Sequence, residues 1–563
     1  MVALVETLAT IPPWTPETDP ELARALGFLD WPVDGETVLR AGDGAGILVA
    51  TILWAVLAGI LGLTSLALPV AVVLGLGVTA IARYLPSGLA TARRTRALGT
   101  APELVSNAVL RMRLRPTTET AAAFAAETGD GRLARSLAGH VRRARGTGRS
   151  GLSTFADEWA EWFPALRRAL TLVESAGSAP TEERERALDS ALSVTLDGTR
   201  ETMAEFAANV QGPATALYAF GVLLPLALVA LLPTAGTIGV NVPIATVVVG
   251  YDLLLPTALL LASAWLLVRR PVAFPPARIT RAHPDVPDRR WPAPLAGTTA
   301  AVTAWVVVGR IAPTWTAGVT APAIGVGTSL IVAYRPMIAV RSRVRAIEAG
   351  LPDALYLVGR EVDRGRSVET ALDDAVALLD SATGEVFADA VRQQRQLRAG
   401  VRESFLGSHG ALRTVPSERA RSTAELLAVA ASEGQPAGPA IVSMADHLDD
   451  LQGVEREIRR DLERVTSTLA NTAAVFGPLV GGSTVTLARQ MSSDGPLTAA
   501  VSPAALGTAV GVYVVLLAMI LTALATGLQR GFDRSLLGYR IGRALCLASV
   551  VFVAGFVGTG LLV

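Results

Sequence analysis

The chain has 563 residues, of which 51% are hydrophobic and 18% charged, and its formal net charge is +1. A soluble protein of this length would carry more charge and would spread its apolar residues more evenly. All 50 basic residues are arginine. This excludes a phosphate-binding P-loop and Schiff-base chemistry, because both require a lysine side chain. Any nucleotide-driven work must therefore come from another protein.

Cysteine and histidine are too sparse to build a disulfide or a metal cluster. Cys546 is the only cysteine and lies within an apolar run. The four histidines are far apart in the sequence and have no second ligand at helical spacing: His140, His283, His409 and His447. We therefore expect no cofactor, no metal site and no catalytic residue, and the chain is not predicted to be an enzyme.

Apolar runs of about 18 residues or more predict membrane-spanning helices, and the sequence contains about nine of them. They lie near Ile47–Leu63, Leu66–Tyr84, Ala214–Pro233, Ala245–Val268, Pro294–Ile311, Thr316–Tyr334, Leu469–Ala488, Leu506–Leu528 and Ile541–Leu562. The sequence thus predicts an all-α, polytopic protein of the cell membrane, surrounded by the lipid bilayer.

Arginine in the connecting loops predicts the orientation of these spans, because cytoplasmic loops retain positive charge. The loop 269–293 is basic, whereas 234–242 carries no charge. Alternation through nine spans then places the N-terminus in the cytoplasm and the C-terminus outside.

The same alternation places two long polar stretches in the cytoplasm. Both are rich in Ala, Leu, Glu and Arg, with apolar residues at three- and four-residue intervals, which predicts helical bundles. The predicted order is an acidic cytoplasmic segment at 1–46, transmembrane hairpins at 47–84, 214–268, 294–334 and 468–528, helical bundles at 85–213 and 335–467, a basic loop at 269–293 and a final transmembrane helix at 541–562.

The two halves of the chain resemble each other, which predicts an internal duplication. The recurring residues lie about 250 positions apart: Tyr84 and Pro86 with Tyr334 and Pro336, Glu119-Thr120-Ala121 with Glu369-Thr370-Ala371, and Val141-Arg142 with Val391-Arg392. Further on, Phe220-Gly221 matches Phe476-Gly477 with a small drift in spacing. The predicted unit is hairpin, bundle, hairpin, used twice and followed by a ninth helix.

Three stretches of the second repeat follow a known helix-turn-helix pattern: Leu351-Pro352-Asp353-Ala354-Leu355, Arg364-Gly365-Arg366-Ser367-Val368-Glu369-Thr370-Ala371-Leu372, and Leu426-Leu427-Ala428-Val429-Ala430-Ala431-Ser432-Glu433-Gly434. This pattern resembles the type II secretion system F domain, found in the inner-membrane platform proteins of type IV pili, type II secretion and the archaeal flagellum. Two copies and nine helices look most like the archaeal branch. In the first repeat Arg115-Pro116 replaces the glycine turn, which predicts the loss of part of the shared partner surface.

The resemblance implies a role and a set of partners. A platform protein would dock a cytosolic hexameric secretion ATPase on its bundles and pass the motion of the ATPase to pilin-like subunits. Such platforms are commonly pictured as homodimers. The resemblance leaves open whether the filament is a pilus, a flagellum or a secretion pseudopilus.

Clustered arginines supply candidate docking residues for an acidic partner surface, because guanidinium groups bind carboxylates in bidentate fashion. The candidates are Arg142 and Arg145 in the first bundle and Arg392, Arg395, Arg398 and Arg402 in the second. The second set recurs at three- and four-residue steps and is predicted to share one helical face. A solvated face is the alternative interpretation. We expect no nucleic-acid binding, since few aromatic residues are available to stack on bases. The juxtamembrane Arg341, Arg343 and Arg345 are expected to contact anionic headgroups.

Asp252 is the only acid well inside a predicted span. A carboxylate within the membrane is a functional candidate by default. We favour a structural pair with Arg310 of another helix over an ion pathway.

Two other functions compete with a platform. A secondary transporter often contains internal repeats, but these spans hold almost no ionisable residue, and a transporter would not need two large bundles. An intramembrane enzyme would need a base to activate a serine, and no histidine or lysine lies near the serines of the spans.

Overall fold

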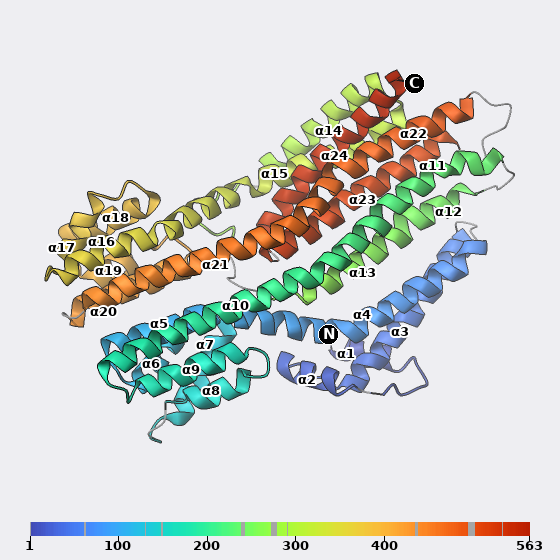
Figure 1. Cartoon of the computed structure of the whole chain (residues 1–563). Helices are drawn as coiled ribbons and strands as arrows, with labels where there is room; N and C mark the ends of the chain where they lie inside the picture. Colours follow the sequence, from blue (N-terminus) through green and yellow to red (C-terminus); the bar gives the residue numbers. More distant parts are fainter. Residues whose placement is uncertain are drawn as a thin grey trace.

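The computed structural model describes residues 2–17, 19–60, 64–129, 131–147, 150–237, 242–271, 279–289, 291–433, 437–493, 502–531 and 533–562. These residues form α-helices with a few short π-helical segments, and none of them lies in a strand. Long helices run side by side through the molecule, and two groups of short helices gather at one end (Figure 1). The prediction of an all-α protein is confirmed.

Eight helical segments are long and apolar enough to cross a membrane, which indicates a membrane protein. They are Gly35–Gly59, Ala67–Leu114, Thr181–Leu232, Ile244–Val268, Pro292–Ile311, Thr314–Asp363, Pro503–Arg530 and Arg534–Leu562. Large apolar side chains such as Leu76 and Val302 stand exposed on them, at 64% and 65% of their surface. Such exposure is unfavourable in water and expected in lipid.

The ninth predicted span, near Leu469–Ala488, is not among these eight, so the count of nine is not confirmed. The segment is helical, but its glycines and hydroxyl side chains lower its mean hydropathy. It also packs against other helices, with Thr486 donating a hydrogen bond to the Phe556 carbonyl at 2.8 Å. Most of the following predicted loop, at 494–501, lies outside the described residues.

Two helical hairpins have closely packed backbones. The first joins α3 (Gly35–Ala55), extended by η1 (Val56–Ile60), to α4 (Thr64–Leu98). The second joins α14 (Pro292–Ile311) to α15 (Thr314–Ala349). A Cβ at Gly75 would lie 2.8 Å from the Gly46 carbonyl oxygen, and a Cβ at Gly325 would lie 2.9 Å from that of Gly297. Only glycine permits such close contact between neighbouring helices.

Two short helices precede the first hairpin and pack on it. They are α1 (Val2–Ala9) and α2 (Pro20–Leu29), and α3 already begins at Gly35, within the segment predicted to precede the membrane. Phe28 of α2 lies against two guanidinium groups, 5.0 Å from Arg94 and 4.0 Å from Arg132. These cation–π contacts hold α2 against α4 and the first bundle.

The first bundle consists of five short helices and the polar part of a long one. They are α5 (Ala101–Leu114), α6 (Thr118–Thr128), α7 (Gly131–Ala144), α8 (Leu152–Trp159), α9 (Pro164–Ala176) and α10 (Thr181–Tyr218). Pro102 and Pro164 lie in the first turns of α5 and α9, where the missing amide hydrogen costs nothing. Trp159 and Phe155 are fully buried at the centre of this bundle.

The second bundle has the same kind of composition. It contains α16 (Leu351–Asp363), α17 (Val368–Val376), α18 (Ala382–Leu397), α19 (Val401–Leu406), α20 (Glu418–Glu433) and α21 (Ala437–Asn471). Gly365 turns the chain between α16 and α17 with a φ of +90°, and the Ser367 hydroxyl caps α17 by accepting from the Thr370 amide. This local helix-turn-helix is as predicted. The second predicted turn, at Gly434, lies outside the described residues.

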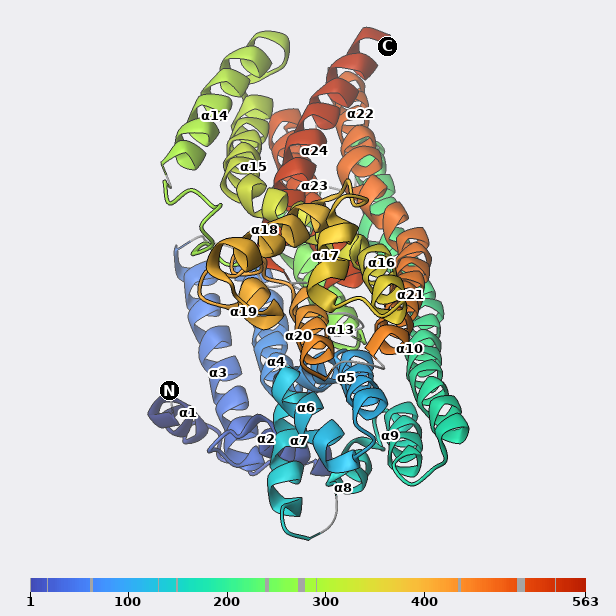
Figure 2. The ribbon, with the colours of Figure 1, turned by 90° about the vertical axis from the view of Figure 1, so that its left-hand side faces the viewer.

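Long helices connect each bundle to the apolar helices. α10 continues through η2 (Ala219–Leu223) into α11 (Leu224–Thr237), and α21 continues through η4 (Thr472–Phe476) into α22 (Gly477–Ser493). The remaining apolar helices are α12 (Ile244–Val248), η3 (Val249–Leu254), α13 (Leu255–Val268), α23 (Pro503–Arg530) and α24 (Arg534–Leu562). Figure 2 shows the two bundles stacked at the near end, with the apolar helices extending behind them.

Candidate partner-binding surfaces

The predicted arginines of the first bundle are exposed. Arg142 lies in the last turn of α7, and Arg145 follows in the next turn of the chain, with Arg143 beside them. Within the described residues none of the three forms an ion pair with a carboxylate. Their guanidinium groups can therefore bind an external anion without first breaking an internal salt bridge.

The predicted arginines of the second bundle do not share one helix. α18 ends at Leu397, Arg398 follows in the left-handed conformation with a φ of +51°, and Arg402 belongs to α19. The expected single arginine face is therefore wrong. The regular spacing of these arginines predicted one continuous helix, but α18 ends at Leu397, between Arg395 and Arg398.

Three of these four arginines already have partners in their own bundle. Arg392 lies 2.8 Å from Asp389, Arg395 lies 2.5 Å from Asp373, and Arg402 lies 2.8 Å from Glu425. All three guanidinium groups are more than half exposed, so the pairs are weak. Each of these three arginines therefore has an acid in its own bundle, whereas Arg142, Arg143 and Arg145 have none among the described residues.

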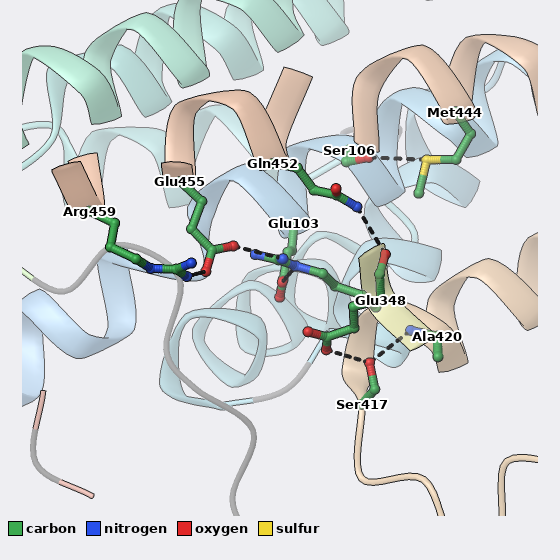
Figure 3. A network of polar contacts seen from close by, with 10 residues as sticks. Glu103, Ser106, Glu348, Ser417, Ala420, Met444, Gln452, Glu455 and Arg459 are labelled. Atoms are coloured by element: carbon green, nitrogen blue, oxygen red, sulfur yellow. Dashed lines mark hydrogen bonds and ion pairs between the residues drawn. The ribbon is translucent and has the colours of Figure 1, made fainter. Parts of the chain in front are cut away.

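A polar cluster joins the two bundles where α5 meets α20 and α21 (Figure 3). Arg419 of α20 donates to Glu103 of α5 at 3.3 Å and to Glu455 of α21 at 3.0 Å. Glu455 also accepts from Arg459 at 2.7 Å. Burial acts to lower the pKa of Arg419, but the surrounding carboxylates prevail and raise it above its ordinary value. Arg419 thus stays charged and links the bundles.

The same cluster ties the end of α15 to the second bundle. The Ser417 hydroxyl donates to the Glu348 carboxylate at 2.6 Å and accepts from the Ala420 amide at 3.1 Å. Gln452 donates to the Glu348 carbonyl oxygen at 2.9 Å (Figure 3). These bonds hold α15, α20 and α21 in one arrangement.

His447 of α21 is buried near this contact, and its Nε2 has no hydrogen-bond partner. Burial, together with the charges of Arg113 and Arg419, lowers the pKa of His447 to about 4. The imidazole is therefore neutral at physiological pH. It lines a cleft of about 410 Å³ between α10 and α21, whose acidic residues are Asp189, Asp197, Asp446 and Asp450.

A larger cleft of about 640 Å³ separates the outer ends of the two bundles. Arg111 and Glu127 line it from the first bundle, and Arg402, Arg413 and Arg421 line it from the second. Its charges are mixed, since Glu418 and Glu425 also face it. The cleft therefore marks where the bundles separate and does not form a site for one kind of ligand.

Asp252 and Arg310 do not form an ion pair within the described residues. Asp252 lies in η3 with one buried carboxylate oxygen that has no hydrogen-bond partner. Arg310 is exposed at the end of α14. Arg341, expected at the lipid headgroups, is buried instead and pairs with Asp533. Arg343 is exposed and lies 3.3 Å from Glu385.

Two buried tyrosines donate hydrogen bonds to backbone carbonyls of η2 and α11. The sequence pattern alone did not predict these bonds. Pro225 has no amide hydrogen to donate to the Gly221 carbonyl, four residues earlier. The Tyr513 hydroxyl donates to that carbonyl instead, and Tyr251 donates to the Pro225 carbonyl at 2.8 Å. The two rings meet edge to face, 5.5 Å apart. These contacts tie α11 to η3 and α23.

No group of three or more possible metal ligands occurs in the described part of the chain. Comparison with protein-family models, with curated proteins and with solved structures finds no match for this chain.

Proposed function

We propose that this chain is the membrane platform of a type IV pilus-like filament or secretion machine. In this proposal the bundles lie in the cytoplasm and dock a secretion ATPase, and the membrane helices act on pilin-like subunits. The observation that carries the proposal is the continuity of four long helices between bundle and membrane. They are α4, α15, α10 with α11, and α21 with α22.

Continuity matters because a helix transmits displacement along its axis better than a flexible linker does. α4 and α15 have 35 and 36 residues, and α10 and α21 have 38 and 35 before their π-helical segments. Each bundle continues into two such helices. A partner that rotates or tilts a bundle would therefore move the attached membrane helices.

The element order supports an internal duplication. α5 and α16 begin 250 residues apart, as do α6 and α17, and α4 and α15. The long helices of both halves are interrupted by a π-helical segment, at Ala219–Leu223 and at Thr472–Phe476. Independent folds would have no reason to share these positions.

The hairpin glycines give a second, independent line of support for duplication. Gly46 and Gly75 lie at a close contact of α3 and α4, and Gly297 and Gly325 lie at a close contact of α14 and α15. The members of these pairs also lie about 250 residues apart. This correspondence supports a repeated hairpin.

The exposed arginines of the first bundle supply the test. Membranes from the native cells are solubilised, and the tagged protein is captured as wild type and as Arg142→Glu/Arg143→Glu/Arg145→Glu. We expect a secretion-type ATPase to co-purify with wild type and to be reduced at least ~10-fold with the triple variant, since charge reversal opposes docking on an acidic surface. The matched control is Arg167→Glu/Arg168→Glu on α9 of the same bundle.

Two outcomes would count against the proposal. Equal recovery of the ATPase with the triple variant and with wild type would show that Arg142, Arg143 and Arg145 do not contribute to docking. Failure to recover any ATPase under crosslinking conditions that preserve the complex would contradict the platform itself. The second bundle's Arg392→Glu/Arg395→Glu/Arg398→Glu variant is expected to have the smaller effect, since two of those arginines are internally paired.

A secondary transporter is the second candidate, and Asp252 is the observation that favours it. The residue lies in a π-helical segment within an apolar helix, and π-helical turns often mark functional sites. An unpaired carboxylate there could bind a coupling ion. Proton-coupled uptake in vesicles that is abolished by Asp252→Asn would support transport, and the absence of any such uptake would reject it.

A further inference from the structure

Five arginines gather where the apolar helices meet the bundles. Arg530 is the last residue of α23, Arg270 follows α13, and Arg540 lies in the second turn of α24. Arg345 belongs to α15 and Arg459 to α21, and both of these helices pack against α23. Such a concentration of positive charge at one level of a helical protein needs compensation.

Most of these guanidinium groups have a partner. Arg270 donates to the Leu528 carbonyl oxygen at 2.6 Å, at the C-terminal end of α23 where the helix dipole is negative. Arg459 pairs with Glu455 at 2.7 Å, and Arg540 donates to the Gln529 side chain at 2.7 Å. Gln529 in turn donates to the Thr466 hydroxyl at 2.6 Å.

Arg530 differs from Arg270, Arg459 and Arg540. Its Nε is buried without a hydrogen-bond partner, and in the described part of the chain it forms no ion pair. The charged groups that act on it are all arginines: Arg345, Arg540, Arg459 and Arg341. Arg341 and Arg459 are paired with Asp533 and Glu455. Arg530 has no such counter-ion in the described part of the chain, and an anion bound beside this partly buried guanidinium would stabilise it.

We propose that the Arg530 cluster, defined as Arg530 with Arg345 and Arg540, binds the phosphate group of an anionic lipid headgroup. The guanidinium fork matches phosphate oxygens in bidentate geometry. Basic pockets between membrane helices on the cytoplasmic side are suited to anionic headgroups. Exposed apolar side chains of α24, Leu547 and Val550, follow Arg540 along the helix and offer a surface for an acyl chain.

The test uses the full-length protein in a nonionic detergent and follows its thermal unfolding midpoint. Phosphatidylglycerol, phosphatidylcholine and inorganic phosphate are added separately to wild type, Arg530→Gln and Arg464→Gln. Arg464 is the matched control, because its side chain is 84% exposed on α21. We expect phosphatidylglycerol to raise the wild-type midpoint by ~3 °C or more, because a ligand of the folded state stabilises it.

Arg530→Gln should lose at least half of that increase, and Arg464→Gln should keep it. Without lipid, Arg530→Gln should be at least as stable as wild type, because the substitution removes like-charge repulsion. The lipid-free midpoint therefore shows whether the variant has lost its lipid site or its fold. Retention of the full increase by Arg530→Gln, or an equal increase with phosphatidylcholine, would overturn the proposal. An equal, Arg530-dependent increase with inorganic phosphate would overturn the lipid assignment in favour of free phosphate.

Discussion

Arg419 of α20 donates a hydrogen bond to Glu103 of α5 at 3.3 Å, although the two residues lie 316 positions apart in the chain. Their contact joins the second bundle to the first. The side chains are 13% and 25% exposed, so both groups are mostly withdrawn from water. An ion pair in this environment holds a specific arrangement, because either group alone would be unfavourable there.

Replacing Arg419 by methionine should destabilise the protein by about 3 kcal/mol, because the carboxylates of Glu103 and Glu455 would lose their counter-ion. Equilibrium unfolding of the detergent-solubilised protein measures this change. Arg456→Met is the control, since Arg456 is 59% exposed and lies 3.5 Å from Asp449; its cost should be below about 1 kcal/mol. Equal costs for the two variants would show that the Arg419 contact does not hold the bundles together.

His447 should make the protein less stable in acid. Its pKa is lowered to about 4 in the folded state, from an ordinary value of 6.5. Between these values the unfolded chain binds a proton that the folded chain does not, so stability rises with pH across this window and is lost as pH falls. The loss should reach about 3 kcal/mol below pH 4.

Unfolding measured from pH 7 to pH 4 tests this prediction. His447→Leu should remove most of the decrease below pH 6.5, whereas the exposed His409→Leu should retain it. A pH profile of His447→Leu that matches wild type would exclude His447 as the cause.

Tyr513→Phe should cost about 1–3 kcal/mol, because the Gly221 carbonyl would be left buried without a donor. Pro225→Ala tests whether the Tyr513 hydroxyl replaces the amide hydrogen that Pro225 lacks. Alanine has an amide hydrogen that can donate to Gly221, so Tyr513→Phe should cost less in a Pro225→Ala background than in wild type. The four unfolding free energies form a double-mutant cycle. A coupling energy near zero would show that the hydroxyl does not replace the proline's missing donor.

Two glycines of α24 should respond to alanine in opposite ways. A Cβ at Gly555 would lie 2.6 Å from the Leu479 carbonyl oxygen of α22, whereas a Cβ at Gly558 would meet nothing within 4 Å. Gly555→Ala should therefore cost about 1–3 kcal/mol through overpacking. Gly558→Ala should be neutral or stabilising by up to about 1 kcal/mol, because alanine favours the helix. Equal melting temperatures for the two variants would argue against this packing of α22 on α24.

The glycines of α22 contact two different neighbouring helices. Gly477 and Gly481 face side chains of α23, Leu517 and Val514. The close backbone contact with α24 uses Gly482 instead, whose Cβ would lie 2.3 Å from the Phe552 carbonyl oxygen. Four-residue spacing identifies one helix surface, but only the neighbouring helix decides which surface is contacted.

For the candidate docking residues, too, the sequence predicted which residues are present but not which of them are paired. Arg142 and Arg145 were expected to be available to a partner, and the structure leaves them exposed and unpaired among the described residues. Arg395 and Arg402 belonged to the same expectation, but each has an acid at hydrogen-bond distance. The composition of a segment reports how many charges it carries. Their pairing depends on the short distances created by folding.

Properties that depend on neighbours in sequence could be predicted from the chain alone. Mean hydropathy over one helix length predicted the membrane character, and three- and four-residue periodicity predicted the helical bundles. Contacts between distant segments required the folded chain, as with Arg419 and Glu103 or Tyr513 and Gly221, and so did the gathering of arginines around Arg530. The physical reason is that burial and Coulomb interactions depend on distance in space, and helix packing brings residues together without regard to their separation in sequence.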